Sequence, residues 1–162
     1  MEKVEMNKDM KLSEHFTLGE LTKTSYKTED QNIPSRVAIE NLKNLCENWL
    51  EDLRYSYNAP YPRDCSQKEM PLVINSGYRS PEVNKRAGGS ATSNHLTGCA
   101  VDIRVAGFEQ AIRYASILLD ISAGTKRDYD ELFIERNKAG SHWIHFAVKP
   151  NGNRRKAGFI LT

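Results

Sequence analysis

The amino-acid sequence predicts an α+β domain whose sheet is mostly antiparallel. Two observations lead to this prediction. Apolar residues recur at helical spacing in the first third of the chain, whereas short apolar runs bounded by turn residues cluster in its second half. Helices at the front with strands gathered behind them favour antiparallel pairing over a series of βαβ units. The chain of 162 residues suits one domain, which we expect to span 1–162.

The composition is that of an ordinary soluble globular protein. Hydrophobic residues make up 39% and charged residues 27%, and the formal net charge is only +2, so nothing favours nucleic acid as a partner. No stretch approaches the roughly 20 apolar residues of a membrane-spanning helix. The charged segment 1–10 does not resemble a secretory signal, so we expect synthesis in the cytoplasm. Three cysteines without a close pair favour a reducing compartment.

The first third of the chain is expected to be mainly helical. A short helix is predicted within 12–21, where Thr17 is the candidate N-cap. The most regular helical pattern covers 35–55, and Ser35 precedes it as the expected cap. A polar stretch over 60–69 is interpreted as a surface loop, because two prolines open it.

A strand, a turn and a second capped helix are expected next. The apolar run over 71–75 predicts a buried strand that ends at a Ser-Gly turn. Ser80 followed by Pro81 is typical of a helix start, since proline is tolerated at the first helical position. The two glycines at 88–89 should end that helix.

The remaining half of the chain is expected to supply most of the sheet. Strands are predicted over 99–105, 131–135 and 143–148, and an amphipathic helix over 108–119. The basic triplet 154–156 is interpreted as a solvated edge of the protein.

Three residues of this half form a candidate metal site. His95, Asp102 and His145 would supply two imidazole nitrogens and one carboxylate oxygen. This donor set suits a catalytic zinc ion, which keeps one position open for water. Gly98 would let the chain turn between the loop that carries His95 and the strand that carries Asp102. A single carboxylate leaves the ion with a net positive charge, which acidifies water and polarises a carbonyl group.

Each of these residues also has a simpler interpretation. A buried Asp102 needs a cation or a metal, and Arg104 lies on the same strand face by alternation, so the two would form an ion pair. His145, between two apolar neighbours, would then be a hydrogen-bonded core histidine. Cys99 should point to the opposite strand face, and we interpret it as a core residue. Spacing alone leaves both interpretations open.

Arg79 is a further candidate, because it directly follows the expected strand over 71–75 and its turn. Active-site loops gather at strand ends, and a guanidinium group can hold a carboxylate or a developing oxyanion. The simpler interpretation is an arginine exposed on the surface.

Taken together, these segments resemble the zinc D-alanyl-D-alanine carboxypeptidase family, which includes phage and bacterial peptidoglycan endopeptidases. The most specific feature is a Ser-x-His-x6-Asp segment followed by Trp-x-His. The matching segments are HFTLGEL at 15–21, SGYRSPEVNKRAGGSATSNHLTGCAVDI at 76–103, YDELFIE at 129–135, WIHFAV at 143–148 and GNRR at 152–155.

The resemblance implies a hedgehog/DD-peptidase fold, in which helices flank a mostly antiparallel sheet. It implies that the zinc ion is held by His95, Asp102 and His145. It also implies that Arg79 stabilises the tetrahedral intermediate and that Ser93 lies near the substrate.

The activity implied is hydrolysis of an amide bond in peptidoglycan stem peptides, by a D-Ala-D-Ala carboxypeptidase or an endopeptidase. The peptide is then the partner, with no nucleic acid and no membrane, and we expect a monomer. A phage or prophage enzyme would reach the cell wall through lysis.

One position departs from the family pattern. Many members carry Glu or Asp three residues before the last zinc histidine, as the base that activates water, and here that residue is His142. We expect His142 to be the base if it lies in the turn before the strand, with Glu135 as its rival. The missing carboxylate also supports an alternative: a binding module that recognises cell-wall peptide without cutting it. A structural protein without metal is a third possibility.

Overall fold

A five-stranded sheet organises the molecule. The computed structural model describes residues 6–59 and 69–162, and the strand order is β3-β4-β6-β5-β7. Neighbouring strands are antiparallel except β5 and β7, which run parallel. The predicted α+β class with a mostly antiparallel sheet is confirmed. The strands are β3 (Ile74–Ser76), β4 (Ala100–Arg104), β5 (Glu131–Arg136), β6 (His142–Ala147) and β7 (Lys156–Leu161).

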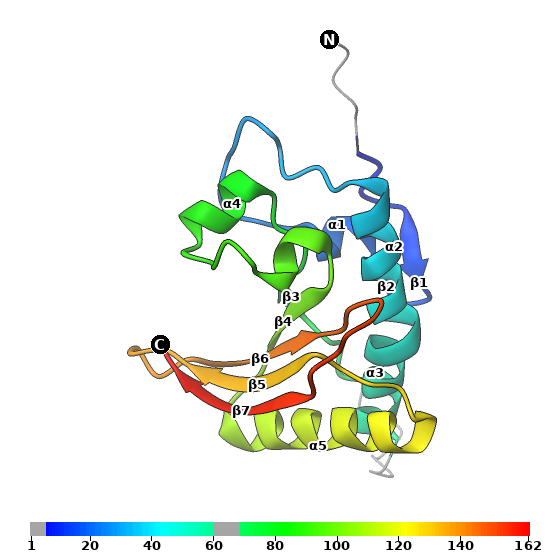
Figure 1. Ribbon diagram of the computed structural model, residues 1–162. Helices are drawn as coiled ribbons and strands as arrows, with labels where there is room; N and C mark the ends of the chain where they lie inside the picture. Colours follow the sequence, from blue (N-terminus) through cyan, green and yellow to red (C-terminus); the bar gives the residue numbers. More distant parts are fainter. Residues whose placement is uncertain (1–5, 60–68) are drawn as a thin grey trace.

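The two faces of the sheet have different neighbours (Figure 1). Helix α5 (Phe108–Thr125) packs along one face, while the segment with α4 (Pro81–Arg86) and η2 (Asn94–Thr97) lies over the other. The core lies on the α5 side, where the side chain of Phe146 packs against Trp49 with ring centroids 5.1 Å apart. The opposite face is therefore available for polar side chains.

The expected helix over 35–55 is confirmed as a longer helical segment. It consists of α2 (Arg36–Leu45), the π-helical turn η1 (Cys46–Leu50) and α3 (Glu51–Asn58). The side chain of Ser35 caps it, accepting the N–H of Ala38 at 3.1 Å. A π turn adds a residue to a helical turn, so the side chains of α3 are rotated relative to the pattern of α2.

The helix expected over 12–21 is much shorter in the structure. Only α1 (Leu18–Leu21) is helical, with the predicted Thr17 cap completing a capping box. The preceding residues pair as β1 (Lys11–Ser13) and β2 (Phe16–Thr17). The reason is tertiary: in the hairpin the side chains of Leu12 and Phe16 are buried in the core, and Oγ of Ser13 donates to Oε1 of Glu51 on α3 at 2.6 Å.

Three predicted strands match β4, β5 and β6 to within one residue at each end. Helix α4 begins after the predicted cap Ser80, and α5 continues six residues beyond its predicted end at Leu119. The strand expected over 71–75 begins later, at Ile74.

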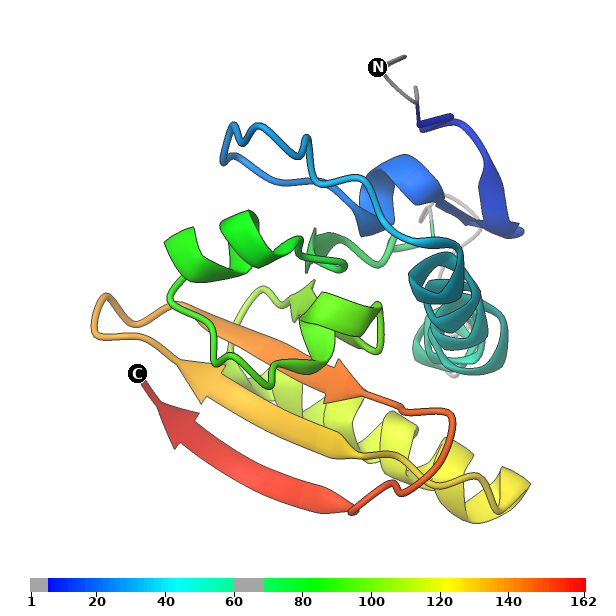
Figure 2. The same ribbon diagram turned by 45° about the horizontal axis from the view of Figure 1, so that its top comes forward.

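Strand β7 was not predicted from the sequence. It is one of the two outer strands of the sheet and is exposed along most of its length, with Phe159 and Leu161 turned largely to solvent. Figure 2 shows this strand running beside β5 at the edge of the sheet.

Some expectations fall outside the described residues. The loop expected over 60–69 lies there almost entirely, as do Cys65 and residues 1–5. Cys46 and Cys99 are buried free thiols. Within the described part of the chain, every helix is too short or too polar to cross a lipid bilayer.

Candidate metal centre

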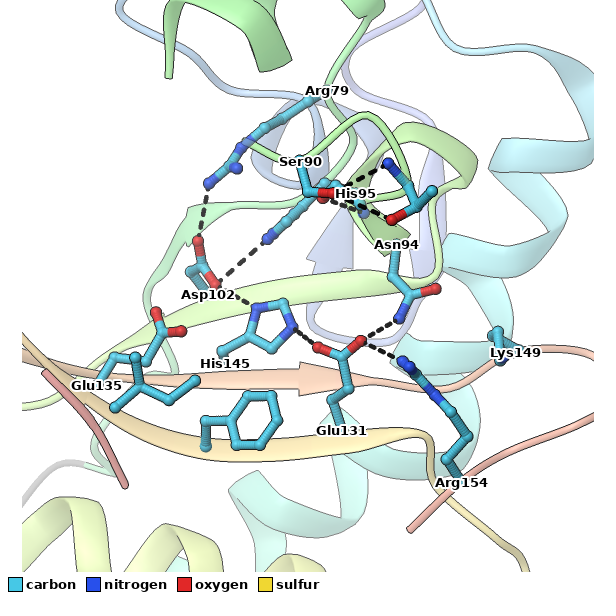
Figure 3. A pocket seen from close by; sticks show the side chains of 14 residues that line it. Arg79, Ser90, Asn94, His95, Asp102, Glu131, Glu135, His145, Lys149 and Arg154 are labelled. Atoms are coloured by element: carbon cyan, nitrogen blue, oxygen red, sulfur yellow. Dashed lines mark hydrogen bonds and ion pairs between the residues drawn. The ribbon is translucent and has the colours of Figure 1, made fainter. Parts of the chain in front are cut away.

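Three predicted metal ligands meet on the sheet face opposite α5. His95 comes from η2, Asp102 from β4 and His145 from β6. Asp102 and His145 are direct cross-strand partners, so their side chains share a face. The Nε2 atom of His95 lies 3.3 Å from Oδ1 of Asp102, and Nδ1 of His145 lies 3.0 Å from the same oxygen (Figure 3). One ligand atom from each of the three residues lies within 4.8 Å of the others.

A tight turn places His95 beside the sheet. Ser93 caps η2 by accepting the N–H of His95 at 3.2 Å. Gly98 then ends η2 with φ of +73°, a left-handed conformation that favours glycine. A Cβ atom there would lie 2.4 Å from the backbone oxygen of Ala38 in α2. The predicted turn at Gly98 is thus present, and it lets β4 start immediately after the turn.

The ring of His95 is oriented by the backbone. Its Nδ1 lies 2.6 Å from the carbonyl oxygen of Gly77. Because a carbonyl oxygen only accepts, Nδ1 must carry a proton, and Nε2 is the ring nitrogen that faces Asp102. The side chain is almost fully buried.

The carboxylate of Asp102 is shared between the two imidazoles and an arginine. Its Oδ2 accepts a hydrogen bond from Nη2 of Arg79 at 3.0 Å, while Oδ1 faces His95 and His145. Burial alone would raise the pKa of Asp102, but the two histidines lower it to well below the ordinary value. Asp102 is therefore ionised.

The alternative ion pair between Asp102 and Arg104 is wrong. Nε of Arg104 instead donates to Oδ1 of Asn75 at 3.3 Å, and the side chain is exposed. Arg79 takes the place at the carboxylate because its strand-end turn lies directly above Asp102, and its Nε is also held by Oγ of Ser76.

His145 lies between two carboxylates. Its Nδ1 faces Asp102, and its Nε2 lies 2.9 Å from Oε2 of Glu131 on β5. Burial favours the neutral ring, but the hydrogen bonds and charges of Asp102 and Glu131 raise the pKa of His145 to about 9. Without a metal, the ring is therefore protonated at neutral pH.

This donor set fits a zinc ion. Zinc bonds of about 2.0 to 2.1 Å in a tetrahedron separate the ligand atoms by roughly 3.3 Å, close to the two distances to Oδ1 of Asp102. Each ligand is also held on its outer side: His95 by Gly77, Asp102 by Arg79 and His145 by Glu131. Such outer contacts are typical of metal ligands.

The cluster lines an open cleft of about 570 Å³, a volume typical of a ligand site. Arg79, Ser93 and Glu135 line the same cleft, so the structure brings them to the candidate metal ligands. The carboxylate of Glu135 points toward Asp102 (Figure 3). Burial raises the pKa of Glu135 above its ordinary value.

His142 does not lie where a catalytic base would be needed. The role expected for it required a position in the turn before the strand, but it is the first residue of β6. It lies three positions before His145, an odd number, so its side chain points to the opposite sheet face. There its ring contacts Phe108 of α5, with centroids 5.6 Å apart.

Sequence reasoning missed four residues around the site: Asn94, Asp130, Glu131 and Arg154. Arg154, interpreted as a solvated edge, in fact pairs with Asp130 and Glu131. The sequence did contain a signal for Glu131: it lies four positions before Glu135 on the same strand, so both side chains point to the same sheet face. No local pattern indicates the contact of Arg154, because it depends on how β7 returns to the sheet.

The fold and site define a class of protein: a mixed α+β protein with a His-Asp-His metal centre in a cleft. The comparison with protein families gives a match to Peptidase M15 over residues 14–129. The chain belongs to the Peptidase M15 family of D-Ala-D-Ala carboxypeptidase-like zinc metallopeptidases. This confirms the predicted family and its hedgehog/DD-peptidase fold. His95 and Asp102 lie within the match, whereas His145 follows it. The comparison with curated proteins gives no match.

Proposed function

We propose that this protein is a zinc-dependent peptidase that hydrolyses an amide bond in peptidoglycan stem peptides. One observation supports this most strongly: His95, Asp102 and His145 converge in a cleft that also contains the carboxylate of Glu135. Membership of a family of D-Ala-D-Ala carboxypeptidase-like enzymes supports the substrate class.

The metal, when bound, supplies a Lewis acid that polarises the scissile carbonyl and lowers the pKa of water. The chain itself must move the protons. Glu135 is our candidate for the base that takes a proton from water and then delivers it to the leaving amine. A carboxyl group with a raised pKa suits both steps near neutral pH.

Arg79 and Ser93 line the cleft, and Arg79 lies on the side opposite the β5 carboxylates (Figure 3). The guanidinium of Arg79 keeps Asp102 oriented, and its charge would stabilise the negative charge that develops on the carbonyl oxygen. Ser93 lies next to His95 and would contact the peptide backbone of the substrate.

The position of Glu135 favours an enzyme over the alternative binding module. The module was suggested by the absence of a carboxylate at residue 142. The carboxylate of Glu135, from the neighbouring strand β5, lines the cleft instead, which supports catalysis.

A pair of variants tests the assignment of the base. Glu135→Gln should lower kcat by about 100-fold or more while zinc stays bound, because general-base catalysis typically contributes 10²–10⁴-fold. His142→Ala should retain most of the activity, since the ring lies on the other sheet face. The measurement is release of new amine ends from purified peptidoglycan and from defined stem peptides.

Mass spectrometry of the products separates the two activities: free D-alanine indicates a carboxypeptidase, and larger peptide fragments an endopeptidase. Whichever of the two activities is present, chelation should abolish product formation and added zinc should restore it. Full activity of Glu135→Gln would refute its role as base. Binding of stem peptides by the zinc-loaded wild type, without any new amine ends, would instead favour the binding module.

A further inference from the structure

A polar network supports the metal centre on the side away from Asp102. Glu131, the first residue of β5, accepts a hydrogen bond from Nε2 of His145 through Oε2, at 2.9 Å. Its second oxygen, Oε1, accepts from Nδ2 of Asn94 at 2.8 Å and from Nη2 of Arg154 at 2.7 Å. Both oxygens are engaged, so the carboxylate is held in one orientation (Figure 3).

The donors that hold Glu131 are themselves anchored at Asp130. This carboxylate is fully buried, and it accepts from Nε and Nη2 of Arg154 at 3.0 and 2.7 Å. Nδ2 of Asn94 donates to it at 2.9 Å, and Nζ of Lys149 lies 3.3 Å away. Two-point binding of a guanidinium to a carboxylate restricts its geometry. Arg154 and Asn94 therefore form a rigid bridge between the two carboxylates.

We propose that Glu131 is a positioning residue of the metal centre, which keeps Nε2 of His145 protonated and directs Nδ1 at the metal. Asn94 and Arg154, anchored by Asp130, keep Glu131 in place. The presence of the metal in this inference rests on the proposed function.

The geometry gives Glu131 this role and not that of a ligand. Nδ1 of His145 points into the three-residue cluster with Oδ1 of Asp102, whereas Nε2 points away from it. A carboxylate behind a metal-bound imidazole fixes the tautomer and raises the basicity of the ligand. Glu131 does for His145 what the carbonyl oxygen of Gly77 does for His95.

The test measures zinc affinity of the full chain by competition with a chromophoric chelator. Glu131→Ala should bind zinc about 10- to 100-fold more weakly than wild type, the range typical of lost outer contacts. Glu131→Gln should lose less zinc affinity than Glu131→Ala, because its amide oxygen can still accept a hydrogen bond from Nε2 of His145. Arg154→Ala should also weaken zinc binding, since Oε1 of Glu131 then loses one of its two donors.

Two matched controls come from neighbouring residues. Asp128→Ala removes an exposed carboxylate shortly before β5, which pairs with Arg155, and should leave zinc affinity unchanged. Arg155→Ala removes the next arginine, which pairs with Asp128 and not with Glu131, and should also leave it unchanged. Far-UV circular dichroism of the metal-free variants checks that each is folded.

A second measurement does not depend on any variant. Long-range ¹H–¹⁵N NMR spectra of the zinc-loaded wild type should show His145 protonated at Nε2. Protonation at Nδ1, with the metal on Nε2, would overturn the inference, as would wild-type affinity in Glu131→Ala.

The outcomes separate this inference from the proposed function. A wild type that binds no zinc refutes both. If the wild type binds zinc but cuts no peptide, and Glu131→Ala binds zinc more weakly, the positioning role is supported and the peptidase is refuted. Active wild type together with unchanged affinity in Glu131→Ala refutes the positioning role alone.

Discussion

The side chains of the metal centre have their protonation states set by their neighbours. The ring of His95 is oriented by the carbonyl oxygen of Gly77, which accepts the proton of Nδ1. Asp102 is kept ionised, and His145, between Asp102 and Glu131, has its pKa raised to about 9. A metal at Nδ1 of His145 must therefore displace a proton at neutral pH, so zinc binding becomes weaker as the pH falls.

The raised pKa of His145 predicts how the metal-free protein responds to pH. The folded-state value of about 9 lies above the ordinary 6.5. The stabilisation from the protonated ring is therefore fully present below about pH 6.5 and is lost as the pH rises through about 9. We expect this to lower the free energy of unfolding by roughly 1 to 3 kcal/mol.

Urea unfolding of the chelated protein at several pH values between these limits measures the effect. His145→Ala should lack this part of the pH dependence, whatever its absolute stability. A free energy of unfolding that stays constant in wild type over this range would contradict the prediction.

At the scale of elements, the connection between η2 and β4 decides where two ligands lie. Gly98 has a positive φ and lies against the backbone of α2, so a side chain at this position fits only if the turn or α2 moves. The short turn brings His95 over the strand that begins at Ala100, two residues after Gly98. The glycine thus links helix packing to the geometry of the metal centre.

Gly98→Ala should destabilise the fold by at least about 2 kcal/mol, from backbone strain together with the contact to Ala38. Gly124→Ala is a matched control: this helical glycine has open space around its Cβ position, so alanine should stabilise α5 by roughly 0.5 to 1 kcal/mol. Thermal and urea unfolding measure both. Wild-type stability of Gly98→Ala would show that the turn can relax.

For the whole molecule, the metal centre joins parts of the chain that are distant in sequence. One ion would contact η2, β4 and β6, and the network behind it extends through Glu131 on β5 to Arg154 just before β7. Because an ion that binds only the folded state stabilises it, the metal should strengthen the assembled sheet as a unit.

Zinc should therefore raise the melting temperature of the chelated protein. At a free concentration 100 times Kd, the stabilisation is about 2.7 kcal/mol, which corresponds to roughly 5 to 10 °C for a chain of this size. Scanning calorimetry with and without zinc measures it. His95→Ala should show little or no shift, and an equal shift in that variant would place the stabilising ion elsewhere.

The sequence by itself determined the elements whose patterns are local. The helix at 35–55 and its Ser35 cap, the strands β4 to β6 and the cap at Ser80 all depend on residues a few positions apart. The candidate ligand set came from spacing and from a family resemblance. Backbone periodicity and capping depend on neighbours in sequence, which is why these predictions agree with the structure.

Only the tertiary structure decided which residues surround that centre. His142 faces α5 because it is part of strand β6. Successive side chains of a strand point to opposite faces, so a difference of one residue in position changes the face. Arg79, and not Arg104, reaches Asp102 because a separate turn lies over the sheet. Arg154 reaches Glu131 only because the chain returns along β5 as an edge strand, a non-local pairing that no local pattern encodes.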